Sequence, residues 1–261
     1  MKRRPALLSS SVAFLLALLL TITWHELGHA LAAVALGLRP TLYPFSVDTR
    51  TVTDAQQVTT ALAGPVLSLV TGAVLLAVHA RLRRTGFCPL TLLWLGLAGV
   101  QTFAGYLITG IFVRSGDIGK ALDLTGAPLW VGVVVFVLGW ALTYVNGRHA
   151  TRQLLRLTDP ARELAPQLRD LGLFAWLLAT VVAFLISAGT FDVGSAGAAI
   201  AVFEVLGTLS TGIFLIFVRL FMGEPPARRE APAWPVPWAG IAAVVVVALL
   251  RQVVLARGVT F

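Results

Sequence analysis

Two histidines and a glutamate stand close together in an apolar part of the chain. They belong to the stretch His25-Glu26-Leu27-Gly28-His29, inside a largely apolar run from Ala6 to Leu38. On a helix, residues four apart share a face, so His25 and His29 would present two imidazoles to one point. With Glu26 beside them as general base for a metal-bound water, they form half of a zinc hydrolase site.

The membrane setting strengthens this interpretation. An ionisable group near the centre of a bilayer costs about 2.5 to 3.5 kcal/mol on insertion scales, so three such groups within five residues require a partner in the protein interior. A bound cation meets that requirement. The alternatives are a chance match to a short motif and a polar cluster that only packs helices together.

The composition places the whole chain in a membrane. Hydrophobic residues make up 57% of the 261 residues and charged residues 12%, about half the share that is usual in soluble domains. The length allows six or seven transmembrane helices, so we expect an all-α polytopic bundle. The net charge of +8 comes from basic residues beside apolar spans. It therefore predicts contact with anionic lipid headgroups and does not indicate nucleic acid as a partner.

The apolar segments divide the chain into a catalytic core and a set of additional helices. We expect the core at residues 1–126 and the additional helices at 127–261, with a basic amphipathic linker at 148–170. The expected spans are Ala6–Leu38, Val58–Ala80, Cys88–Val113, Leu129–Tyr144, Leu171–Phe191, Ala196–Met222 and Trp238–Ala256. The polar segment Pro40–Gln57 after the first span predicts either a small hairpin or a simple loop.

The arrangement of Lys and Arg predicts the orientation in the membrane. With the N-terminus inside, fourteen basic residues lie on the inner side and five on the outer side. The inner set is 2–4, 81, 83, 84, 148, 152, 156, 162, 169, 219, 228 and 229. This bias predicts a cytoplasmic N-terminus. We expect the bacterial inner membrane, since the chain carries no organelle signal.

A catalytic zinc needs a third protein ligand, and the order of the spans indicates where it comes from. The other two histidines, His79 and His149, fall at the opposite membrane face from the end of the first span. The third span ends on the same side as the first, just before Asp117, which we favour as the ligand. Asp123 is the competing acid.

These features together resemble the site-2 protease family of intramembrane zinc metallopeptidases. The likeness covers about residues 20–125 and is carried by His25-Glu26-Leu27-Gly28-His29-Ala30, by Ala63-Gly64-Pro65 with Ser68, and by Asp117 after the third span. Ser68 stands where the family has Asn, and Ser115-Gly116-Asp117 replaces the family's Asn-Pro-x-x-x-Asp-Gly motif.

The resemblance implies a three-helix core that binds one Zn²⁺ per chain through His25, His29 and Asp117, with Glu26 as general base. It implies that the hairpin receives an extended substrate and that Gly64, Pro65 and Ser68 position it. The expected activity is hydrolysis of peptide bonds in membrane-embedded or membrane-proximal substrates. The alternative is a non-catalytic metal-binding or scaffold protein derived from such a protease.

One further acid stands within an expected span. Glu204 is compatible with a water path through the membrane, and equally with a protonated carboxyl bonded to a nearby Ser or Thr. Together with the Gly-Pro break in the second span, it also leaves a transporter as a third hypothesis. We find no internal repeat to support a transporter.

Overall fold

The protein is an all-α polytopic membrane bundle. A computed structural model describes residues 4–50, 53–82, 85–188, 207, 209–216 and 234–261. Within those residues, six helices are long and apolar enough to cross a membrane. The predicted fold class is therefore confirmed. Most of the expected span Ala196–Met222, Glu204 included, lies outside the described residues.

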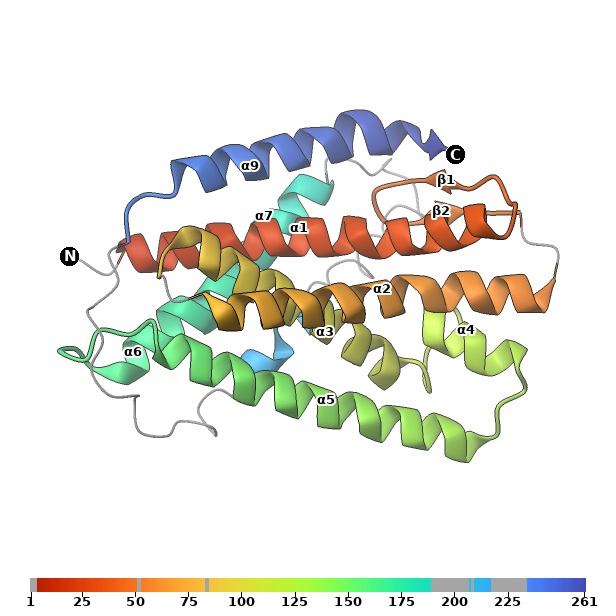
Figure 1. The fold of residues 1–261 in the computed structure, drawn as a ribbon, viewed down its shortest axis with the longest axis horizontal. Coiled ribbons are helices and arrows are strands. Elements are labelled where there is room, and N and C mark those ends of the chain that lie inside the picture. The colour runs from red at the N-terminus through yellow and green to blue at the C-terminus, as the bar shows by residue number, and fades with distance from the viewer. Residues whose placement is uncertain (1–3, 51–52, 83–84, 189–206, 208, 217–233) are drawn as a thin grey trace.

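Helix α1 (Arg4–Ala35) forms the centre of the bundle. It packs against α2 (Asp54–Arg81), α3 (Phe87–Thr109), α7 (Ala175–Ala188) and α9 (Trp238–Leu249). Figure 1 shows α1 running between α9 and α2. Its first half is the core of the fold: Phe14 is 1% exposed, and its ring centroid lies 4.7 Å from that of Trp94.

Glycines allow the first three helices to approach closely. A Cβ atom at Gly28 of α1 would lie 2.9 Å from the carbonyl oxygen of Ala63 on α2. A Cβ at Gly72 of α2 would lie 2.7 Å from the backbone nitrogen of Val100 on α3. Small residues at such crossings bring helix backbones together in membranes. The second half of α1 is thereby held directly against α2.

Helix α2 begins four residues earlier than the sequence predicts. Thr53 and Gln56 form a capping box, in which the Thr53 hydroxyl accepts from the Gln56 amide at 3.2 Å and the Gln56 side chain accepts from the Thr53 amide at 3.2 Å. This pair satisfies two amide groups at the start of the helix. The polar segment after the first span is correspondingly shorter than expected.

Helix α5 (Leu129–Leu155) is longer than the expected span, which ended at Tyr144. It continues through the first part of the expected linker 148–170, because Ala150, Leu154 and Leu155 are buried in the hydrophobic core. Just before this stretch, polar side chains attach α5 to α3: Asn146 donates to the carbonyl of Leu97 at 3.1 Å, and Gln101 donates to Thr143 at 3.1 Å. Three short elements complete this region: α4 (Asp117–Leu124), α6 (Leu164–Leu168) and the π-helical segment η1 (Arg169–Phe174).

The polar segment after α1 is a hairpin, which confirms the first of the two expectations. Strand β1 (Thr41–Leu42) pairs antiparallel with β2 (Val47–Asp48). A third strand that was not predicted from the sequence, β3 (Val259–Thr260), pairs antiparallel with the other edge of β1. In Figure 1 this sheet lies beside the far end of α1, next to the end of the last span.

Candidate metal centre

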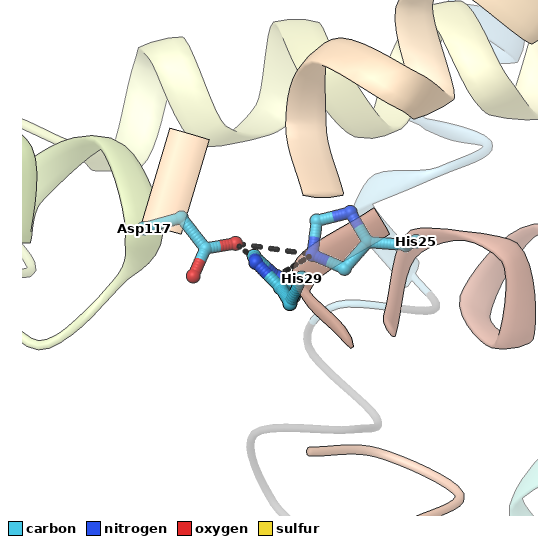
Figure 2. Close-up of side chains that lie close together, drawn as sticks. All are labelled: His25, His29 and Asp117. Atoms are coloured by element: carbon cyan, nitrogen blue, oxygen red, sulfur yellow. Dashed lines mark hydrogen bonds and ion pairs between the residues drawn. The ribbon is translucent and has the colours of Figure 1, made fainter. Parts of the chain in front are cut away.

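Three predicted side chains from two elements converge inside the bundle. His25 and His29 project from α1, and Asp117 is the first residue of α4. His25 Nε2 lies 3.0 Å from Asp117 Oδ2, His29 Nε2 lies 3.3 Å from the same oxygen, and the two Nε2 atoms lie 3.1 Å apart. Figure 2 shows the three side chains pointing at one another.

Hydrogen bonds at the far side of each ring fix the histidine tautomers. His29 Nδ1 lies 2.6 Å from the carbonyl oxygen of Thr60, which can only accept, so this nitrogen carries a proton. Ser68 donates its hydroxyl proton to the Gly64 carbonyl at 3.0 Å, which leaves the Ser68 oxygen to accept from His25 Nδ1 at 3.2 Å. Both Nε2 lone pairs are therefore directed at the centre of the cluster.

This arrangement fits a divalent cation. Two imidazole lone pairs and a carboxylate oxygen are all acceptors, so their close approach requires positive charge between them, which a metal ion or protons on the rings can supply. Ligand atoms on a tetrahedral zinc lie about 3.3 Å apart, because each lies about 2.0 to 2.1 Å from the ion. The observed separations of 3.0, 3.1 and 3.3 Å are close to that value. Two histidines and one carboxylate are also a donor set that zinc uses in hydrolases.

Asp117 is held in its ionised form. Burial alone would raise the pKa of its carboxyl. When the Nε2 atoms of His25 and His29 carry protons, their hydrogen bonds and the positive charge of the rings hold that pKa well below its usual range. A bound cation would replace these protons and favour the same ionised form. Its place in the first turn of α4 further favours a negative charge. The site therefore offers a carboxylate at neutral pH.

The competing acid lies away from the cluster. The Asp123 side chain is 64% exposed, and its Oδ1 lies 3.5 Å from Arg114 Nη1. The geometry therefore favours Asp117 over Asp123 as the third ligand. Among the residues that the structure describes, His25, His29 and Asp117 form the one group of metal-ligating side chains of this kind, and His79 and His149 lie outside it.

Glu26 is buried beside the cluster, with 8% of its surface exposed. It directly follows His25 on α1, so the backbone keeps it next to one of the three ligands. It is available to move protons there.

The Ala63-Gly64-Pro65 stretch and Ser68 shape the site from α2. A Cβ atom at Gly64 would overlap His29 Nε2 and would lie 2.9 Å from the His25 carbonyl oxygen, so only glycine leaves room for the ring. Pro65, inside the helix, lacks the N–H that would bond the Ala61 carbonyl. In this structure Gly64 and Ser68 position the histidines, and their expected role toward a substrate stays a prediction.

Two contributors were not singled out by sequence reasoning. The ring of Tyr106 on α3 stacks on the His25 ring, with centroids 4.9 Å apart and an interplanar angle of 5°, and its hydroxyl interacts with Asp117. Thr60 contributes only a backbone carbonyl, which any residue could supply. A tyrosine about two turns before the end of an expected span is a weak signal, because tyrosine is common near membrane interfaces.

The fold and the cluster together define a class: a polytopic helical membrane protein with a buried centre of two histidines and one carboxylate. The comparisons with known proteins do not narrow this class. No protein-family model, curated protein or solved structure matches the chain.

Proposed function

We propose that this chain is an intramembrane zinc metalloendopeptidase of the site-2 protease type. The observation that carries the proposal is the convergence of two oriented histidine nitrogens and the Asp117 carboxylate inside a membrane bundle, with the buried carboxyl of Glu26 beside them. A site built only to hold a metal needs its ligands and has no use for a neighbouring base.

In this proposal His25, His29 and Asp117 hold one zinc ion per chain. When bound, zinc lowers the pKa of water and polarises a carbonyl oxygen, which is the chemistry that peptide hydrolysis needs. Glu26 accepts the proton of the attacking water and returns it to the leaving amine. Thr60 and Ser68 keep the two rings oriented, and Tyr106 holds the His25 ring and the Asp117 carboxylate in place.

The substrates we propose are membrane proteins or peptides cut within or near the bilayer. A peptide bond inside an intact helix is hydrogen-bonded and shielded, so the substrate must be extended where it is cut. Both sides of β1 are already paired, with β2 and with β3. An extended substrate that adds to this sheet would therefore pair with the outer edge of β2 or β3, or displace β3.

The proposed location is the bacterial inner membrane with a cytoplasmic N-terminus. The count of fourteen basic residues against five supports the proposed orientation, and the lack of an organelle signal supports the proposed membrane. We also propose that exposed cations on the inner side, such as Arg162, contact anionic lipid headgroups. In the structure, Arg162 Nε lies 3.2 Å from Asp159 Oδ2.

The test compares the wild type with Glu26→Gln in the same membrane. Both proteins should carry about one zinc per chain, because glutamine leaves the three ligands intact. New peptide termini, detected by mass spectrometry of labelled membrane proteins, should appear with the wild type and be absent with Glu26→Gln. Termini that persist in the variant would overturn the role of Glu26. A zinc-loaded wild type that yields no cleavage would favour the non-catalytic metal-binding or scaffold protein.

A further inference from the structure

Arg251 is a buried cation in the last span that the proposed chemistry does not use. It lies in a π-helical segment, η3 (Leu250–Val254), that continues α9, and it is 2% exposed. A charged side chain in an apolar span is costly and is retained where it has partners in the protein. Its partners therefore indicate what it does.

The guanidinium binds α1 immediately before the metal-site residues. Arg251 Nη1 donates to the Thr23 hydroxyl at 2.6 Å and to the Leu19 carbonyl at 3.2 Å. Thr23 donates its own hydroxyl proton to the Leu19 carbonyl at 2.9 Å, so its oxygen is left to accept from Arg251. Thr23 stands two residues before His25. The contact thus holds the helical turn that leads into the site.

The face of the same guanidinium packs on the hairpin. The Arg251 carbon Cζ lies 4.4 Å from the centroid of the Phe45 ring, in the turn between β1 and β2. A planar cation over an aromatic face is attractive, and more so when both are removed from water. One side chain therefore joins the last span, the hairpin and α1. Eight residues later the chain pairs with β1 as β3, so the last segment contacts the hairpin at two places.

Arg251 also brings a positive charge to the turn of α1 that leads to Glu26. Its partner Thr23 lies three residues before Glu26 on that helix. The guanidinium cannot lose its proton in a protein, so this positive charge is permanent. Its contacts with Leu19 and Thr23 fix its position relative to Glu26, because all three are on the same helix.

We propose that Arg251 is a positioning residue, which fixes the hairpin of residues 41–48 and the last span to the turn of α1 that carries His25 and Glu26. The hairpin then keeps one position over this end of α1, with a permanent cation beside Glu26. Any effect of Arg251 on peptide cleavage rests on the proposed function. Its effect on the position of the hairpin rests only on the contacts described above, and this effect can be tested without a substrate.

The test measures hydrogen exchange and zinc content on the full chain in nanodiscs, for the wild type, Arg251→Met and Arg251→Lys. Arg257→Met is the matched control, because Arg257 is an exposed cation in the same segment. We expect amide exchange in 41–48 and 259–260 to become at least about tenfold faster in Arg251→Met, with zinc content and the exchange of α2 and α3 unchanged. Arg251→Lys keeps the charge but loses the planar face, so it should recover the protection only in part.

A second variant approaches the same contact from the hairpin. Phe45→Leu removes the aromatic face and leaves the buried cation on α1, so it should loosen the hairpin alone and keep the helices as they are. This variant keeps the test decisive if Arg251→Met fails to fold. Unchanged hairpin exchange in both variants would overturn the proposal, and so would an equal loss of protection throughout the bundle, which is the sign of a merely structural residue. Neither outcome depends on whether the chain cleaves peptides.

Discussion

His25 and Ser68, 43 positions apart, are joined by a 3.2 Å hydrogen bond from the histidine Nδ1 to the serine hydroxyl. Ser68 donates its hydroxyl hydrogen bond to the Gly64 carbonyl, so its oxygen can only accept from His25 Nδ1. His25 is therefore in the tautomer whose Nε2 lone pair faces the cluster. Ser68, which stands at the position of an Asn in the site-2 protease family, thus orients the His25 ring. It orients a ligand from outside the ligand set.

Replacing Ser68 by alanine should weaken metal binding. The His25 ring would lose the acceptor that fixes its tautomer, and partners of metal ligands are typically worth about 10- to 100-fold in affinity. Competition titration with a chelator measures this. Thr71→Ala is the matched control, because Thr71 also donates to a backbone carbonyl of α2, at 2.6 Å, but lies outside the cluster. An equal loss in both variants would point to a general effect on α2.

The two candidate acids should behave differently. Asp117→Ala removes one of three converging ligands and should reduce zinc well below one ion per chain in the purified protein. Asp123→Ala removes only an exposed carboxylate near Arg114 and should keep the full zinc content. Elemental analysis of the zinc content of both variants and the wild type shows which acid is the ligand. Full zinc in Asp117→Ala would remove this residue from the ligand set.

Tyr106→Phe should separate the two contacts of this side chain. Phenylalanine keeps the ring that stacks on His25 and loses the hydroxyl that interacts with Asp117. We expect zinc affinity to fall by about tenfold, while Tyr106→Leu, which removes the ring as well, should lose more. Equal affinity in the wild type and Tyr106→Phe would show that the hydroxyl does not support the carboxylate.

Gly64→Ala should damage the site through steric overlap. The new methyl group would occupy the position of His29 Nε2, so the ring must leave the cluster or the helices must separate. Overpacking of this kind costs about 1 to 3 kcal/mol, and zinc content should fall together with the melting temperature. Gly105→Ala is the control, since its nearest neighbour, Ser210 Oγ, would lie at 3.5 Å. If Gly64→Ala binds zinc as the wild type does, the described packing of α1 on α2 is wrong.

Metal affinity should fall as the pH is lowered. Each histidine must be neutral to bind, so protons compete with the metal at His25 and His29. Asp117 does not add to this competition near neutral pH, because its pKa lies well below the usual range. Between about pH 8 and pH 5, the apparent zinc affinity should drop by up to about tenfold per pH unit for each histidine that gains a proton. Affinity that is independent of pH over this range would argue against histidine ligands.

The sequence by itself determined the membrane class, the all-α fold and the placement of His25 and His29 on one face of a helix. These depend on local properties, namely the length and hydropathy of each segment and the rule that residues four apart share a helix face. For the same reason it located the start of α5 at Leu129 and missed its end at Leu155, since the last turns of that helix are held by the burial of Ala150, Leu154 and Leu155 against other segments.

Only the tertiary structure decided between Asp117 and Asp123, and only it assigned Thr60, Ser68 and Tyr106 to the two rings. It alone paired β3 with β1 and placed Arg251 on Thr23, 228 positions away along the chain. The physical reason is the same in each case. Such contacts arise where segments far apart in the chain meet, as α1 and α2 do at Gly28 and Gly64, and such a meeting point leaves no periodic pattern in the residues that form it.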